Sequence, residues 1–120
     1  RVLFRSESDR LLAVRKLTAR YGGVAVLKGA GTLIADEQGQ MAIADVGNAG
    51  MASGGMGDVL SGIIGGLLAQ KFSLYDAACA GCVVHGAAGD RVAERQGTRG
   101  MLATDLLPDI LHFVNPEWAK

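Results

Sequence analysis

A cluster of glycines in the middle of the chain constrains its fold most strongly. Five glycines lie within the twelve residues 47–58, and a strongly helical segment, 59–70, follows at once. Glycine lets the backbone turn tightly and approach a ligand closely, because it has no Cβ. The helix that follows presents unsatisfied N–H groups and the positive end of its dipole to this loop. The loop therefore predicts an anion site, most often a site for phosphate.

Asp58 is the only charged residue of that loop, and it follows Gly57 directly. The backbone N–H groups of Gly55, Met56 and Gly57 are expected to form the anion hole. A carboxylate beside a phosphate costs electrostatic energy, so we expect Asp58 to act on a substrate hydroxyl, as a positioned base does in phosphoryl transfer. In the alternative interpretation Asp58 only caps the helix. The loop is not a Walker motif, because no lysine follows its glycines.

A second motif, Lys28-Gly29-Ala30-Gly31-Thr32, follows an apolar run at 24–27. The run is typical of a buried strand in a parallel sheet, and ligands bind at the ends of such strands. The motif therefore indicates a ligand-binding turn. The alternative is a plain connection between strands with one solvated lysine.

The rest of the pattern predicts an α/β chain. Helices are expected at 8–21 with Ser8 as cap, 58–70, 74–96 with Ser73 as cap, and 105–114 with Thr104 as cap. Strands are expected at 24–27, 32–35 and 41–44, with a hairpin turn at 36–40. Three strands beside four helices leave sheet edges and faces bare, so we expect part of a larger domain.

The first six residues are expected to be foreign to this fold. The run Arg1-Val2-Leu3-Phe4-Arg5-Ser6 resembles the translated read-through of a sequencing adapter. We therefore expect residues 1–6 to be a non-native leader and residues 7–120 to be a partial domain. The alternative is an ordinary loop or strand start.

Charge and hydropathy disfavour several kinds of partner. The 12 Lys and Arg residues balance the 12 Asp and Glu residues, so no basic field favours nucleic acid or an anionic membrane. No apolar run reaches the roughly 20 residues that span a bilayer, and the N-terminus lacks the pattern of a signal peptide. We expect a cytoplasmic protein without nucleic-acid or membrane partners.

The expected helix at 74–96 carries further reactive side chains. Cys79 and Cys82 form a C-x-x-C in its middle, where no helix N-terminus lowers a thiol pKa, so we expect packing rather than redox chemistry or metal binding. His85 is expected in the core or at a subunit contact, although a Cys/Cys/His cluster is an alternative. Asp90 and Arg91 are expected to be surface or capping groups. No metal site is predicted from these residues.

Three segments carry a resemblance to a known family: Lys28–Thr32, residues 47–62 and His85–Asp90. Together they resemble the ADP/ATP-dependent NAD(P)H-hydrate dehydratases, a branch of the ribokinase-like superfamily, over about residues 8–114. Ala49 departs from that family, which usually has proline there. The resemblance implies the C-terminal portion of a ribokinase-like three-layer α/β/α sandwich.

The resemblance also implies an activity. The family repairs NADH or NADPH whose nicotinamide ring has taken up water, forms called NADHX and NADPHX. A nucleotide phosphate turns the ring hydroxyl into a leaving group, which is then eliminated. The implied nucleotide contacts are Lys28, Gly29, Ala30, Gly31, Thr32 and Gly57. Asp58 is the implied contact to the hydroxyl of the substrate, and ADP (or ATP) and Mg²⁺ are the implied cofactors. Bacterial members typically use ADP and release AMP and phosphate, and we expect a homo-oligomer.

Two other functions remain open on the sequence. A ribokinase-like kinase for a hydroxymethylpyrimidine, a thiazole or a sugar shares the glycine–aspartate motif, but the run Asn48-Ala49-Gly50-Met51 argues against it. A non-catalytic adenine-nucleotide-binding domain is disfavoured by Asp58, since binding alone would not keep a carboxylate beside phosphates. The 120 residues alone are expected to be inactive, because substrate contacts are expected upstream of them.

Overall fold

The computed structural model describes residues 7–28 and 31–115. The elements in chain order are α1 (Glu7–Tyr21), β1 (Val24–Leu27), β2 (Thr32–Asp36), β3 (Met41–Ala44), η1 (Ala49–Ala52), α2 (Met56–Ala69), α3 (Leu74–Gln96), η2 (Ala103–Leu106) and α4 (Leu107–Val114), where η marks a 3₁₀ helix. This order confirms the predicted α/β class. The predicted leader, residues 1–6, lies outside the described residues.

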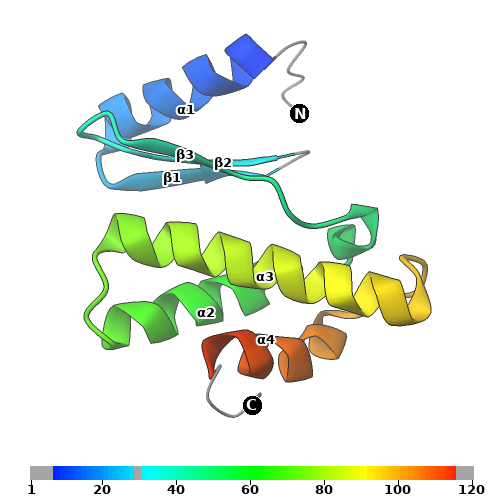
Figure 1. Ribbon diagram of the computed structural model, residues 1–120. Coiled ribbons are helices and arrows are strands. Elements are labelled where there is room, and N and C mark those ends of the chain that lie inside the picture. The colour runs from blue at the N-terminus through cyan, green and yellow to red at the C-terminus, as the bar shows by residue number, and fades with distance from the viewer. Residues whose placement is uncertain (1–6, 29–30, 116–120) are drawn as a thin grey trace.

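Helices cover both faces of the sheet, which gives three layers (Figure 1). α1 packs on one face, against β1 and β2, and α3 packs on the other face, against all three strands. α2 and α4 pack on α3 on the side away from the sheet. The helix–sheet–helix layering is the one that the sequence predicts, and α3 lies at its centre.

The sheet is an antiparallel meander, so the expectation of a parallel strand at 24–27 is wrong. β2 lies between β1 and β3, with Val24 opposite Asp36 and Thr32 opposite Ala44. A short apolar run does not distinguish parallel from antiparallel pairing, and short connections join these strands to their neighbours as antiparallel pairs. β2 is buried along its length, whereas β1 is only half-buried.

The predicted hairpin turn at 36–40 is present. The Oδ1 atom of Asp36 accepts hydrogen bonds from the backbone N–H groups of Gln38 (3.0 Å) and Gln40 (2.8 Å). A short polar side chain that bonds its own backbone in this way stabilises a tight turn.

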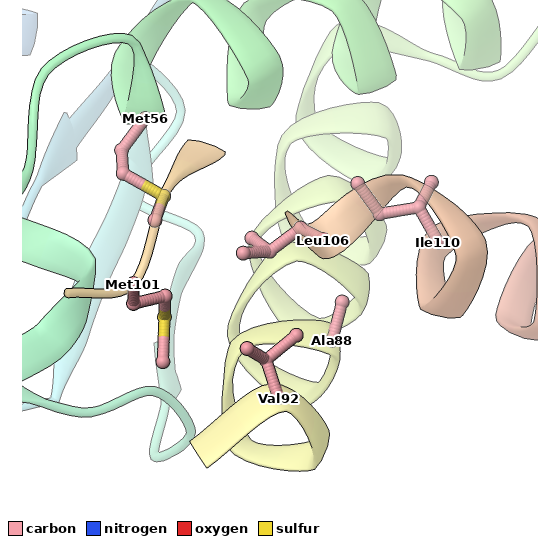
Figure 2. Packing of buried hydrophobic residues seen from close by; sticks show 6 residues of the cluster. All are labelled: Met56, Ala88, Val92, Met101, Leu106 and Ile110. Atoms are coloured by element: carbon pink, nitrogen blue, oxygen red, sulfur yellow. The ribbon is translucent and has the colours of Figure 1, made fainter. Parts of the chain in front are cut away.

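The apolar core has three parts, one between each pair of layers and one among the helices. Successive side chains of a strand point to opposite faces, so Leu33 and Ala35 pack with Val14 of α1, whereas Ile34 packs with Ala78 of α3. The third part joins α2, α3, η2 and α4 (Figure 2). Its buried members are Met56, Ala88, Val92, Met101, Leu106 and Ile110. The small residues of α3 allow the neighbouring elements to approach.

Two helix starts differ from the prediction. α1 begins at Glu7, so Ser8 lies inside it rather than at its cap. α2 begins at Met56, two residues early, because Gly55 takes a left-handed conformation (φ 86°) that ends the preceding turn. The cap of α3 agrees with the prediction, since the Ser73 hydroxyl accepts a hydrogen bond from the Asp76 N–H group.

The last predicted helix is divided in two. Thr104 lies within η2, and Leu102 occupies the cap position, where its N–H group donates to the Asp105 carboxylate (2.8 Å). α4 starts afresh at Leu107 with Pro108 in its first turn, a position that suits proline because no N–H group is needed there. None of the helices in the described ranges combines the length and hydropathy needed to cross a membrane.

Candidate functional site

A hollow of about 770 Å³ lies where the end of β1, the start of β2 and the chain after β3 meet the middle of α3. Its lining residues are Lys28, Gly31, Thr32, Asp45, Val46, Gly47, Asn48, Ala49, Met51, Ala52, Leu60, Cys82, His85 and Gly86. Two of the three segments that the sequence singles out, at 28–32 and 85–90, therefore meet at one place, together with the beginning of the third.

The first predicted motif contributes Lys28, Gly31 and Thr32 to the hollow. Gly31 has a left-handed backbone (φ 79°), which a side chain would strain. The guanidinium of Arg10 on α1 donates a hydrogen bond to the Gly31 carbonyl (2.5 Å), so α1 helps to hold this turn. Gly29 and Ala30, which the sequence also predicts as nucleotide contacts, lie outside the described residues.

The predicted anion hole, residues 55–57, and Asp58 lie at the start of α2. They are not among the described residues that line the hollow; Ala52, three residues before Gly55, is. Met56 is buried in the core, whereas Gly57 and Asp58 are exposed in the first turn of the helix. The first N–H groups of a helix have no partner within it, and the Gly55 cap supplies no side-chain hydrogen bond.

Packing within the described chain does not explain the glycine at position 57. A Cβ built on Gly57 meets no atom of the described chain within 4 Å, and its φ is not left-handed.

The segment after β3 forms one side of the hollow, and we call its residues Gly47, Asn48, Ala49, Met51 and Ala52 the loop wall. Hydrogen bonds from this segment to α3 hold it in place. The Asp90 carboxylate accepts hydrogen bonds from the Gly47 N–H group (2.9 Å) and from Asn48 Nδ2 (3.0 Å). Asn48 Oδ1 in turn accepts from the Gly50 N–H group (3.0 Å), which caps η1. The expectation that Asp90 is a surface or helix-capping group is therefore wrong, because its bonds reach back to another segment.

Two glycines let α3 approach this segment closely. A Cβ on Gly86 would lie 2.9 Å from the Val46 carbonyl carbon, and one on Gly89 would lie 2.8 Å from Met51 Cε. Glycine in a helix interior costs about 1 kcal/mol relative to alanine, so two glycines three positions apart, Gly86 and Gly89, are a signal of such a close approach. The sequence shows that signal, but it does not name the partner segment.

His85 is buried (2% exposed), and its Nε2 atom has no hydrogen-bond partner in the described chain. Burial is the main cause that lowers the pKa of His85 from 6.5 to about 4, and the positive charge of Lys28 lowers it further. A hydrogen bond with the Met56 backbone opposes this shift. The imidazole is therefore neutral near pH 7. The predicted core location is confirmed, and the side chain also connects the hollow with the first residue of α2.

Cys82 lies beside His85 in the lining, and burial raises the pKa of its thiol to about 11. A protonated, buried thiol is a packing group rather than a nucleophile. Cys79 and Cys82 are both free, and both pack in the cluster under the sheet, in agreement with the packing role expected for them.

Comparisons with known proteins agree with the motifs that build this site. The family model described as NAD(P)H-hydrate dehydratase matches residues 1–112. The bifunctional NAD(P)H-hydrate repair enzyme Nnr of Escherichia coli (strain K12) is 68% identical over 111 residues, which are 92% of this chain and 22% of that protein. The ADP-dependent (S)-NAD(P)H-hydrate dehydratase of Neisseria meningitidis (serogroup B, strain MC58) is 48% identical over 103 residues, 85% of this chain and 35% of that protein.

A solved structure shares the fold as well. The ADP/ATP-dependent NAD(P)H-hydrate dehydratase from Bacillus subtilis, co-crystallized with ATP and Mg²⁺, superposes with a TM-score of 0.84 at 27% sequence identity. The match covers 92% of this chain and 40% of that one. The chain thus spans between about a fifth and two fifths of the length of the relatives it matches.

Proposed function

Because this chain belongs to the NAD(P)H-hydrate dehydratase family, we propose that it supplies the nucleotide-binding and phosphoryl-transfer part of an enzyme that dehydrates NADHX and NADPHX. One observation carries the proposal. Lys28, Gly31 and Thr32 share a hollow with the segment that leads into the glycine turn before Asp58. Residues 28–32 therefore share a hollow with the chain just before the glycine turn, which supports a common site for the two motifs that suggest phosphate chemistry.

We assign the nucleotide to the hollow. Its volume of about 770 Å³ lies in the usual range for a small-molecule site. Lys28 provides a positive charge among the lining residues for phosphate oxygens, and Gly31 permits a left-handed backbone beside it that a side chain would strain. The N–H groups of Gly55, Met56 and Gly57, at the positive end of α2, form the anion hole in this proposal. The glycine contacts at 29 and 30 remain predictions from the sequence.

We assign the role of base to Asp58. Its carboxylate accepts the proton of the ring hydroxyl while that oxygen attacks the terminal phosphorus of the nucleotide. The new P–O bond forms as the bond from phosphorus to the leaving nucleotide breaks, so ADP gives AMP and a phosphorylated ring. The C–O bond then breaks, and phosphate leaves with the electron pair as a ring proton is lost. The net change is NADHX and ADP to NADH, AMP and phosphate.

Asp58 suits this role by position. It lies in the first turn of α2, directly after Gly57, whose N–H group we assign to the anion hole. Its exposure within the described chain leaves its oxygens accessible to a substrate. The anion hole one residue earlier would hold the transferred group, and such preorganised donors stabilise charge that develops in a transition state.

Mg²⁺ fits this site only together with the nucleotide, whose phosphates would supply most of its ligands. Within residues 7–28 and 31–115, no three His, Cys, Asp or Glu side chains gather into a metal site. Magnesium in nucleotide sites is held mainly by phosphates and water, with one or two carboxylates, and when bound it neutralises phosphate charge. We also propose a cytoplasmic location and a homo-oligomeric assembly.

The test replaces Asp58 by alanine in an active, full-length protein that contains this sequence. We expect dehydration of NADHX, followed by the recovery of NADH and the release of AMP, to fall at least about 100-fold, the usual loss for a general base. The affinity for ADP, measured by calorimetry, should stay within a few-fold of the wild type. Asp76→Ala is the matched control, because Asp76 is also an exposed aspartate at the third position of a helix.

Two results would refute this assignment. Turnover of Asp58→Ala equal to that of the wild type would remove the base role. Stable phosphorylated product without recovery of NADH would indicate a kinase of the same superfamily instead.

A further inference from the structure

We propose that Asp90 is a positioning residue: acting through Asn48, it holds the loop wall in the shape that binds the nucleotide. This inference rests on the proposed function of the hollow. Asp90 itself is not among the described residues that line the hollow. It acts from the opposite side of the wall, on α3, 42 positions further along the chain than Asn48.

In each of these hydrogen bonds the donor and the acceptor are fixed, starting from the Asp90 carboxylate. A carboxylate only accepts, so Asn48 turns its Nδ2 donor toward Asp90 (3.0 Å). Its Oδ1 atom is then left to accept from the Gly50 N–H group (3.0 Å) and to cap η1. The second Asp90 oxygen accepts from the Gly47 N–H group (2.9 Å). One carboxylate thus fixes the orientation of the Asn48 amide and the backbone on both sides of it.

α3 is a firm support for these bonds. His85 and Gly86, one turn earlier on the same helix, line the hollow directly, and Gly89 lies against Met51 of the loop wall. Burial of this stretch of α3 leaves little freedom for the helix to follow a shifted loop. The loop wall has no regular strand or α-helix of its own, so its shape depends on its bonds to α3.

The polarity of the Asp90–Asn48 pair gives a discriminating experiment. In Asp90→Asn, the new amide N–H₂ group faces the N–H₂ group of Asn48, and two donors cannot bond each other. If the Asn48 amide rotates by half a turn to present its oxygen instead, it no longer accepts the hydrogen bond from the Gly50 N–H group. In Asn48→Asp, two carboxylates face each other and repel. The double variant Asn48→Asp/Asp90→Asn reverses the direction of the central bond and keeps all three hydrogen bonds.

The variants are made in an active, full-length protein containing this sequence, with ADP as the probe in calorimetry and NADHX turnover as the second readout. We expect each single variant to bind ADP about tenfold more weakly, the scale of a lost hydrogen bond to a charged group. The rate at saturating ADP should change less, because the reacting groups are untouched. The double variant should bind ADP within about twofold of the wild type.

Asp105→Asn is the control for a loss of stability alone. The Asp105 carboxylate also accepts from one backbone N–H group, that of Leu102 (2.8 Å), and from one side-chain amide, that of Gln96 (3.2 Å), and neither of these partners belongs to the loop wall. We expect its ADP affinity to equal that of the wild type. An equal loss in Asp105→Asn and Asp90→Asn would overturn the proposal, as would single variants that bind ADP normally.

Failure of the proposed function has a different signature. A wild type that binds ADP without dehydrating NADHX refutes that function, while the ADP affinities of the variants still decide the role of Asp90. If either single variant does not fold, as judged by circular dichroism, the double variant decides. A folded double variant that binds ADP as weakly as expected for the single variants, about tenfold more weakly than the wild type, would overturn the inference.

Discussion

Protonation of His85 should make the protein less stable in mild acid. Burial and the charge of Lys28 lower the pKa of His85 to about 4, from 6.5 in the unfolded chain. Below pH 6.5 the unfolded chain therefore binds a proton that the folded chain does not. The stabilising contribution of neutral His85 is complete above that pH and is lost progressively as the pH falls toward 4.

The magnitude follows from the two pKa values. Between about pH 7.5 and pH 5, a shift from 6.5 to about 4 removes about 2 kcal/mol of the free energy of unfolding. His85→Gln keeps a polar side chain but cannot be protonated. We therefore expect the loss of stability over this pH range to be about 2 kcal/mol smaller in His85→Gln than in the wild type.

Urea denaturation followed by circular dichroism, at both pH values, measures this difference in a full-length protein containing the sequence. Other titrating groups cancel when the two proteins are compared. His112→Gln, at an exposed histidine on α4, is the matched control. An equal pH dependence in the wild type and in His85→Gln would show that the imidazole is not held neutral by its burial, and the reasoning would fail.

Three further predictions concern η2 and α4. Leu106→Ala should lower the free energy of unfolding by about 3 kcal/mol, because Leu106 is fully buried in the cluster of Figure 2. Leu107→Ala should lower it by less than about 1 kcal/mol, because Leu107 is 49% exposed. Equal losses for the two variants in urea denaturation would contradict this packing. Asp109→Asn should cost less than Leu106→Ala, because the Arg91 and Arg95 side chains that bond Asp109 are half-exposed and remain solvated. The hydrogen bond from Arg95 is the main cause that lowers the pKa of Asp109. The wild type should therefore lose the stability that ionised Asp109 contributes as the pH falls through that lowered pKa, whereas Asp109→Asn has no such loss. An equal dependence of the free energy of unfolding on acid pH in the two proteins would refute this prediction.

Much of the architecture could be predicted from local patterns. The glycines around residue 55, the apolar run at 24–27 and the hydroxyl of Ser73 act through their own backbone or their nearest neighbours. Their elements appear within two residues of the predicted positions, apart from the divided C-terminal helix. Local interactions have a local signature, so a sequence can be read for them.

The prediction of the site was less complete. The sequence singled out Lys28, Gly31 and Thr32, and these residues line the hollow. From the sequence, Asn48 had no predicted role in the site, and Asp90 was expected to be a surface or capping group. A bond between residues 42 positions apart leaves no periodicity or spacing that a sequence pattern could register.

By itself, the order of amino acids determined which segments turn, which form helices and which residue types suit phosphate chemistry, because steric freedom, capping and the functional group of a side chain are properties of a residue and its immediate neighbours. Only the tertiary structure decided that the strands pair antiparallel, that α3 is the support of the hollow and that Asp90 faces the loop wall. Those choices depend on which surfaces bury each other when the chain collapses, and that burial is shared among residues far apart in the sequence.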